Sequence, residues 1–128
     1  MTTAALVLAG LAAALHVFIW TMESITWTQP ATWKRFGVAS QADADTTESL
    51  AYNQGYYNLF LAVGAAAGIV FKLSDQDDIG WTLVIFACGS MVAASLVLIT
   101  TGLSYARAAA SQGTIPALAV IASLIAMS

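Results

Sequence analysis

The chain has 128 residues, of which 59% are hydrophobic and only 9% are charged. A water-soluble domain of this size could not bury so much apolar surface in one core, so the composition excludes an ordinary soluble protein and indicates a membrane protein. The net charge of −3 and the lack of a basic stripe exclude nucleic acid as a partner.

Four stretches are apolar enough to cross a bilayer, which takes about 20 mostly apolar residues in a helix. The four expected spans cover approximately residues 3–27, 49–71, 79–103 and 108–127. The first stretch has no Lys or Arg before its apolar core, unlike a secretory signal peptide, so we expect it to be retained. Short connections favour antiparallel neighbours. The sequence therefore predicts one all-α domain, an integral membrane four-helix up-down bundle.

The connections also predict the orientation of the chain. Lys34, Arg35 and Arg107 lie in the first and third connections, whereas Lys72 alone lies in the second. Because Lys and Arg concentrate on the cytoplasmic side, this distribution predicts that both termini lie outside. In the fourth stretch Pro116 could begin a short helix or kink a long one, and we expect the kinked crossing.

Two titratable residues interrupt the first stretch. His16 and Glu23 are seven residues apart, which places them within about 20° of one helix face and about 10 Å apart along the axis. Trp20 and Trp27 share their stripe. A charged carboxylate inside hydrocarbon costs at least about 2.5 kcal/mol, so Glu23 must be protonated, paired or facing water.

The second stretch carries a polar face at its start, formed by Asn53, Gln54, Tyr57 and Asn58. Counted from the expected ends of the two spans, Glu23 and Asn53 lie at one depth. By the same count His16 lies level with Tyr57 and Asn58. Antiparallel neighbours can therefore turn two polar layers toward each other, and Gln112 enters the membrane from the same side.

These residues predict a polar pocket within the membrane, near the cytoplasmic side, for a small amphipathic or lipid-like molecule. The expected ligand-binding residues are Trp20, Trp27, Asn53, Gln54, Tyr57, Asn58 and Gln112. Glu23 and His16 are the candidate acid-base pair if a reaction follows binding, which stays open at this stage. Two ligands at this spacing do not make a metal site, Cys88 is the lone cysteine, and we expect no cofactor.

Three alternatives use the same residues differently. The amides could be interhelical hydrogen-bond glue, with Glu23 reaching toward the headgroups. The chain could be a proton-coupled exporter of the small multidrug type, acting as a homodimer around Glu23. It could also be an accessory subunit that docks on a membrane protein partner through small residues such as the Gly64 and Gly68 pair, although packing within the monomer is the favoured role of that pair.

Four segments of the chain resemble one family. They read LHVFIWTMESITW, KRFGV, NQGYYNLFLAVG and QGTIPALAV, and they extend over nearly the whole chain. This pattern resembles the small four-span bacterial membrane proteins called domain of unknown function 1304, sometimes labelled epimerase. The resemblance implies a location in the bacterial cytoplasmic membrane. It also implies that His16, Glu23, Asn53, Asn58 and Gln112 belong to the signature of the family.

Overall fold

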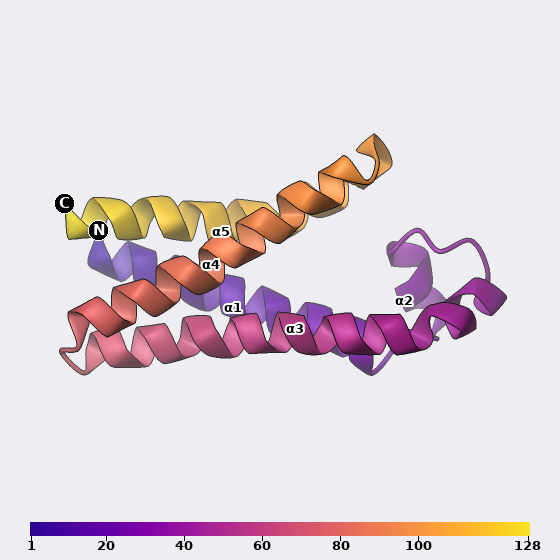
Figure 1. The fold of residues 1–128 in the computed structure, drawn as a ribbon, viewed down its shortest axis with the longest axis horizontal. Helices are drawn as coiled ribbons and strands as arrows, with labels where there is room; N and C mark the ends of the chain where they lie inside the picture. The colour runs from indigo at the N-terminus through magenta and orange to yellow at the C-terminus, as the bar shows by residue number, and fades with distance from the viewer.

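The computed structural model describes residues 1–128 as an all-α protein with four long helices. The elements are α1 (Thr2–Ser24), α2 (Pro30–Arg35), α3 (Gln41–Leu73), α4 (Asp77–Thr100), a 3-10 turn η1 (Leu103–Tyr105) and α5 (Ala106–Met127). All four long helices are long and apolar enough to cross a membrane. Consecutive long helices run antiparallel, and both termini lie at one end (Figure 1). The predicted four-helix bundle is confirmed, and the protein is a multi-pass membrane protein.

Helix α3 begins two turns before the apolar stretch that it contains. The Ser40 hydroxyl accepts a hydrogen bond of 3.1 Å from the backbone N–H of Asp43 and so caps the helix. Asp43 also lies in the first turn, where a negative charge is favourable. The polar residues from 41 to 48 therefore extend α3 beyond the apolar region instead of forming a loop.

The connection between α1 and α3 is ordered by its tryptophans. The indole N–H of Trp27 donates to the backbone oxygen of Ala44 at 3.0 Å. The indole N–H of Trp33 donates to the side-chain oxygen of Gln41, also at 3.0 Å. The Gln41 amide in turn donates to the backbone oxygen of Thr28 at 2.9 Å. These bonds fasten the connection, including α2, to the first turns of α3.

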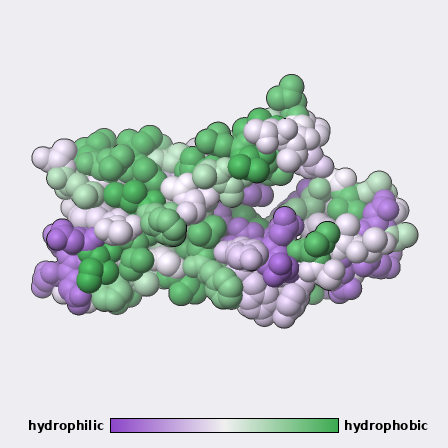
Figure 2. Space-filling view, viewed as in Figure 1, coloured by the Kyte–Doolittle hydropathy of each residue, from purple (hydrophilic) through white to green (hydrophobic).

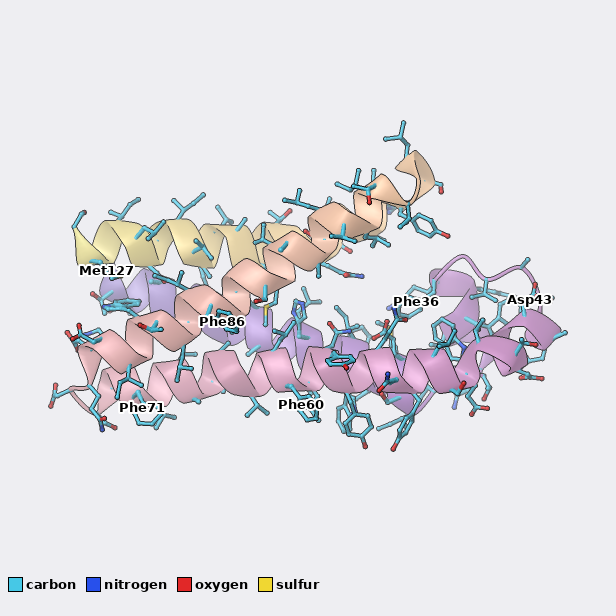
Figure 3. All side chains as sticks on the ribbon, viewed as in Figure 1. Phe36, Asp43, Phe60, Phe71, Phe86 and Met127 are labelled. Carbon is cyan, nitrogen blue, oxygen red and sulfur yellow. The ribbon has the colours of Figure 1, made fainter.

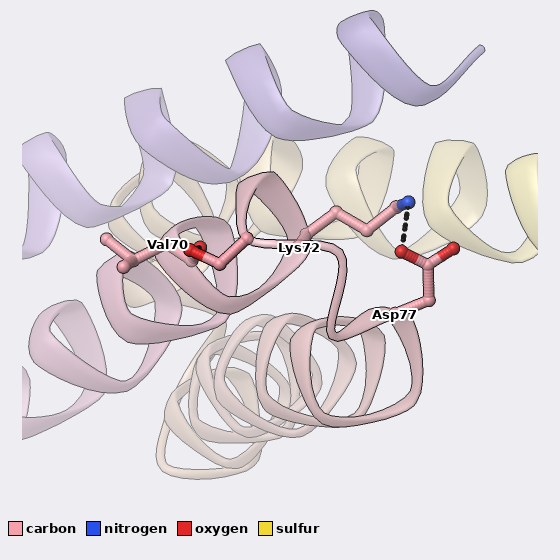
Figure 4. A network of polar contacts seen from close by, with 4 residues as sticks. Val70, Lys72 and Asp77 are labelled. Carbon is pink, nitrogen blue, oxygen red and sulfur yellow. Dashed lines mark hydrogen bonds and ion pairs between the residues drawn. The ribbon is translucent and has the colours of Figure 1, made fainter.

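The turn between α3 and α4 is tight and polar. Lys72 pairs with Asp77 at 2.6 Å, and the Ser74 hydroxyl donates to the backbone oxygen of Val70 at 2.9 Å (Figure 4). Asp77 is mostly exposed, so this ion pair contributes little to stability in water. The turn instead sets the place where α4 starts back along α3.

Helices α3 and α4 touch backbone to backbone near this turn. A Cβ atom added at Gly68 would lie 2.8 Å from the backbone nitrogen of Val84 and 2.9 Å from the oxygen of Gly80. The buried core beside this contact consists mainly of alanines, together with Val84, Cys88 and Met91. Small residues let helix backbones approach closely in lipid, where no hydrophobic drive holds helices together.

At the opposite end of the bundle, α4 diverges from α3 (Figure 1). Figure 2 shows an open hollow between the corner that joins α4 to α5 and the arm formed by α1, α2 and α3, with hydrophilic residues on its α3 side. Helix α5 packs on both α4 and α1 and runs without interruption through Pro116, so the shorter alternative for this span is excluded. We call the hollow the polar cleft.

The close contact at Gly68 predicts a position-specific loss of stability. We expect Gly68→Ala to lower the free energy of unfolding by about 1–3 kcal/mol, because backbone atoms cannot move aside cheaply. Gly89→Ala is the matched control, since a Cβ atom there meets nothing within 4 Å. The measurement is thermal unfolding of the purified protein in detergent. Equal effects of the two substitutions would contradict a tight α3–α4 contact.

Candidate functional site

Glu23 lies in the last turn of α1 and is half-buried. Its Oε2 atom accepts a hydrogen bond of 2.7 Å from the amide nitrogen of Asn58 on α3. The ion pair between Lys72 and Asp77 is at the other end of the bundle, and no Lys, Arg or His pairs with Glu23. The carboxyl group is therefore held by one neutral donor and by no cation.

The register of α1 against α3 brings Glu23 to Asn58. A Cβ atom at Gly55 would overlap the hydroxyl of Ser24 and lie 3.1 Å from the Cβ atom of Glu23. The Ser24 hydroxyl donates to the backbone oxygen of Tyr52 at 2.9 Å, directly beside this contact. A side chain at Gly55 would displace the Ser24 hydroxyl from its bond to Tyr52 and crowd the Cβ atoms of Ser24 and Glu23, so glycine suits this register.

This register corrects the depths expected from the sequence. Glu23 was expected level with Asn53, and His16 level with Asn58. The structure instead joins Glu23 to Asn58, and no hydrogen bond joins His16 to either amide. Glu23 lies beside Gly55, about 3 Å along the axis from the expected level of Asn53, whereas His16, seven residues deeper on α1, lies beyond the level of Asn58.

The other polar residues of α3 lie on the edge of the polar cleft. Asn53, Gln54 and Tyr57 are exposed, and Tyr57 is 64% exposed. They continue the helical stripe of Gly64 and Gly68, the residues that approach α4. Because α4 diverges from α3 at this end of the bundle, α4 does not cover this part of the stripe, and Figure 2 shows hydrophilic residues on the α3 side of the hollow.

The apolar side chains of α3 and α4 mark the lipid-facing surfaces by contrast. Phe60 and Phe86 are 61% and 71% exposed, respectively. Figure 3 shows the side chain of Phe60 projecting outward from α3. Tyr57 and Phe60 are three residues apart and lie about 60° from each other around the helix. By the same count Asn53, seven residues before Phe60, lies about 20° from it, so Asn53 lies near the border between the cleft-facing and lipid-facing sides of α3.

His16 lies deeper, in the packed interior. It is 3% exposed, and its Nδ1 atom lies 2.9 Å from the backbone oxygen of Ala12. It shares the face of Glu23 two turns away, as the spacing predicts, but the two side chains do not bond to each other. Direct proton transfer between them is therefore not what this geometry offers.

Aromatic side chains of α1 and α3 meet within one helical turn of Glu23 and Asn58 along the chain. The rings of Trp20 and Tyr56 meet edge to face with centroids 6.0 Å apart, and Tyr52 lies 5.0 Å from Tyr56. Tyr52 was missed in the sequence, although its spacing of four residues from Tyr56 is a usable signal. Trp27 was expected in the pocket, but it lies in the connection, bonded to Ala44 and packed on Phe36 at 5.1 Å.

Gln112 is half-buried near the start of α5 and makes no side-chain hydrogen bond. Its neighbour Gly113 approaches Ser95 so closely that a Cβ atom would overlap the serine hydroxyl. Helices α4 and α5 therefore stay together at the level where α4 leaves α3. The structure does not bring Gln112 into contact with Glu23 or Asn58.

Other parts of the surface offer less defined chemistry. The acidic turn between α3 and α4 lines two shallow, open hollows with Asp75, Asp77 and Asp78. No three His, Cys, Asp or Glu side chains come together in a group that could hold a metal ion. The pair of Glu23 and Asn58 remains the one place where a carboxyl group inside an apolar span meets a polar partner on another helix.

A family model described as a protein of unknown function, DUF1304, matches residues 10–124. The chain therefore belongs to this family, and the resemblance seen in the sequence is confirmed. Comparison with curated proteins gives no match. Comparison with solved structures gives none either. The family assignment supports the membrane fold and leaves the chemistry to be argued from the residues themselves.

The bond between Glu23 and Asn58 predicts a measurable coupling. In a double-mutant cycle of Glu23→Ala and Asn58→Leu, we expect a coupling free energy of about 1 kcal/mol or more. Hydrogen bonds between membrane helices average about 0.6 kcal/mol. The coupling should be larger here because one partner can carry a charge. Unfolding in detergent measures it. The control cycle replaces Asn58→Leu by Asn53→Leu and should be additive; additivity in both cycles would contradict the bond.

Proposed function

We propose that this DUF1304 protein binds a small amphipathic or lipid-like molecule in the polar cleft, with the headgroup of the molecule beside Glu23 and Asn58. One observation carries the proposal. A carboxyl group has about four lone-pair sites, and Glu23 has a single protein donor. Inside an apolar span the remaining sites need donors, and a ligand headgroup in the cleft supplies them.

The walls of the cleft suit a molecule that is polar at one end. The amides of Asn53 and Gln54 can both donate and accept hydrogen bonds, and the ring of Tyr57 offers a flat apolar surface. All three side chains are exposed on the stripe that faces the cleft. Because the cleft opens between two membrane-spanning helices, a hydrocarbon tail can leave it sideways into lipid. Glu23 is the group placed to exchange a proton with the bound headgroup.

The interior below the cleft favours a pocket that is open at one end over a transport pathway. Ala62, Ala65, Cys88 and Met91 belong to one buried cluster at the deep side of Asn58. Each of these side chains is at most 2% exposed. A proton-coupled exporter would need water to reach Glu23 from both sides, and beyond Asn58 the interior between α3 and α4 is packed with these apolar side chains.

The distribution of the charged residues supports a cleft near the cytoplasm. The connections with Lys34, Arg35 and Arg107 lie at the end of the bundle where the cleft opens, and Lys72 lies at the other end (Figure 1). The excess of Lys and Arg on the cytoplasmic side of membrane proteins supports this orientation, with both termini outside. In a bacterial cell the membrane concerned is the cytoplasmic one.

The proposal is tested by photolabelling in nanodiscs. The probes are a long-chain alcohol, amine and carboxylic acid, each with a diazirine in its chain, and an alkane of equal length. We expect saturable labelling of α3 and α4 by at least one polar probe and none by the alkane. Asn58→Leu should lower the apparent affinity about tenfold, because the pair that orients the headgroup loses a hydrogen bond to a charged group.

Glu48→Ala is the control for loss of negative charge, because Glu48 is exposed on the same helix outside the apolar stretch. It should label like the unaltered protein, whereas Glu23→Ala should not. Labelling that never saturates, or that is equal for the alkane and the polar probes, would show ordinary lipid contact and would refute the proposal.

A further inference from the structure

The imidazole of His16 is largely buried and carries an acceptor atom without a partner in the protein. A carbonyl oxygen can only accept, so in the 2.9 Å contact with Ala12 the hydrogen is on Nδ1 of the imidazole. In the neutral ring Nε2 is then a lone-pair acceptor. Because Nδ1 faces the backbone of α1, Nε2 points away from that backbone and toward the other helices. It has no hydrogen-bond partner in the protein; the side chain is only 3% exposed, but Nε2 itself is not fully enclosed.

Trp20 supplies the complementary group one helical turn away. Its indole N–H is buried and has no hydrogen-bond partner. Residues 16 and 20 are neighbours on one helix face, with Cβ atoms about 5–6 Å apart. Side chains of helices lean toward the N-terminal end, so the indole lies over the turn that holds His16. A buried donor and a partly accessible acceptor, neither with a partner in the protein, thus share one face of α1.

The hydroxyl groups of the protein do not serve this pair. The buried hydroxyl of Ser95 on α4 donates to the backbone oxygen of Val92 at 2.7 Å. The buried hydroxyl of Ser123 on α5 donates to Ala119 at 2.8 Å. The buried indole N–H of Trp20 without a partner is unfavourable unless another molecule accepts its hydrogen.

We propose that His16 and Trp20 form a binding site for a hydroxyl oxygen, which donates to Nε2 of His16 and accepts from Nε1 of Trp20. One oxygen can make both bonds, since each bond reaches about 2.9 Å and the two groups lie on adjacent turns. A carboxylate lacks the hydrogen for the imidazole, and an ammonium group lacks the lone pair for the indole. Only a hydroxyl group or a water molecule does both with a single atom.

The position of this site narrows the class of ligand. It lies between residues 16 and 20, about 7 Å deeper than Glu23 by the helical rise. The inference rests on the proposed function for the molecule that brings the hydroxyl group: an amphipathic ligand of the polar cleft whose headgroup carries a hydroxyl. Water is the second source of the same chemistry. The experiment below separates these two sources.

The test uses the single histidine of the chain. The protein is labelled with 15N-histidine and placed in nanodiscs, and the two ring nitrogen signals are recorded with a long-chain primary alcohol and with its methyl ether. The ether accepts a hydrogen bond but cannot donate one. We expect a protonated Nδ1 and a bare Nε2, and an upfield shift of the Nε2 signal with the alcohol but not with the ether.

Trp20→Phe removes the indole N–H and keeps an aromatic ring. We expect it to reduce or abolish the alcohol-dependent shift, whereas Trp81→Phe, on α4, should not change it. Water is the ligand if the Nε2 signal shows a hydrogen bond before any alcohol is added. In that case alcohol leaves the signal unchanged, whereas Trp20→Phe still shifts it. A proton on Nε2, a free Nε2 in every sample, or a shift that Trp20→Phe leaves unchanged would overturn the inference.

The amide of Gln112 is the internal alternative donor. Ala5 on α1 and Ala122 on α5 belong to one buried cluster. The two helices are antiparallel, so Gln112, ten residues before Ala122, lies at about the level of His16, eleven residues after Ala5. Loss of the Nε2 shift in Gln112→Leu, with no effect of Trp20→Phe, would assign the bond to this amide and refute the hydroxyl site. If the cleft probes label the protein but the Nε2 signal does not shift with alcohol, this inference is refuted and the proposed function stands.

Discussion

The close approach of α1 and α3 at Gly55 is the contact on which the polar half of the molecule depends. With no side chain at this position, the backbone of α3 lies against Ser24 and Glu23. That spacing lets the short amide of Asn58 reach the carboxyl group at 2.7 Å. A carboxyl group in an apolar span needs such a partner, because the surrounding lipid offers none. Glycine therefore sets the register, and the register sets the chemistry.

The two ends of the bundle differ for the same kind of reason. At the turn between α3 and α4, Gly68 and Gly80 allow backbone contact, and the interior is a dry cluster of small side chains. At the other end α4 follows α5, held by the contact of Ser95 with Gly113, and leaves α3. Polar residues on α3 are tolerated there because no helix covers them. The closed end stabilises the fold, and the open end carries the groups that can bind.

Much of the fold is readable from the sequence. Four apolar stretches with short connections predict four antiparallel helices, since length and hydropathy alone decide whether a helix can cross a bilayer. The common faces of His16 with Glu23, and of Gln54 with Tyr57, follow from helical periodicity. The start of α3 at Gln41 was missed because its first two turns are polar and are held by a Ser40 cap and by tryptophans of the connection.

The pairing across helices was not readable in the same way. Periodicity fixes the face of a residue but not its offset against a neighbouring helix, and that offset depends on a contact between Gly55 and Ser24 that no single helix reveals. The contact of Trp27 was not readable for a similar reason, because its hydrogen bond goes to Ala44, seventeen positions away. The divergence of α4 depends on whether α4 packs along α3 or along α5, and only the packed bundle decides this.

Cysteine accessibility tests most directly whether the polar stripe of α3 faces an open cleft. In a background with Cys88→Ala, the variants Gln54→Cys, Tyr57→Cys and Phe60→Cys are exposed in nanodiscs to a water-soluble maleimide. The expected result is fast modification at positions 54 and 57 and little at 60, which lies on the outer face of α3. Equal protection at all three positions would mean that lipid or protein covers the stripe, and would contradict a cleft that admits polar molecules.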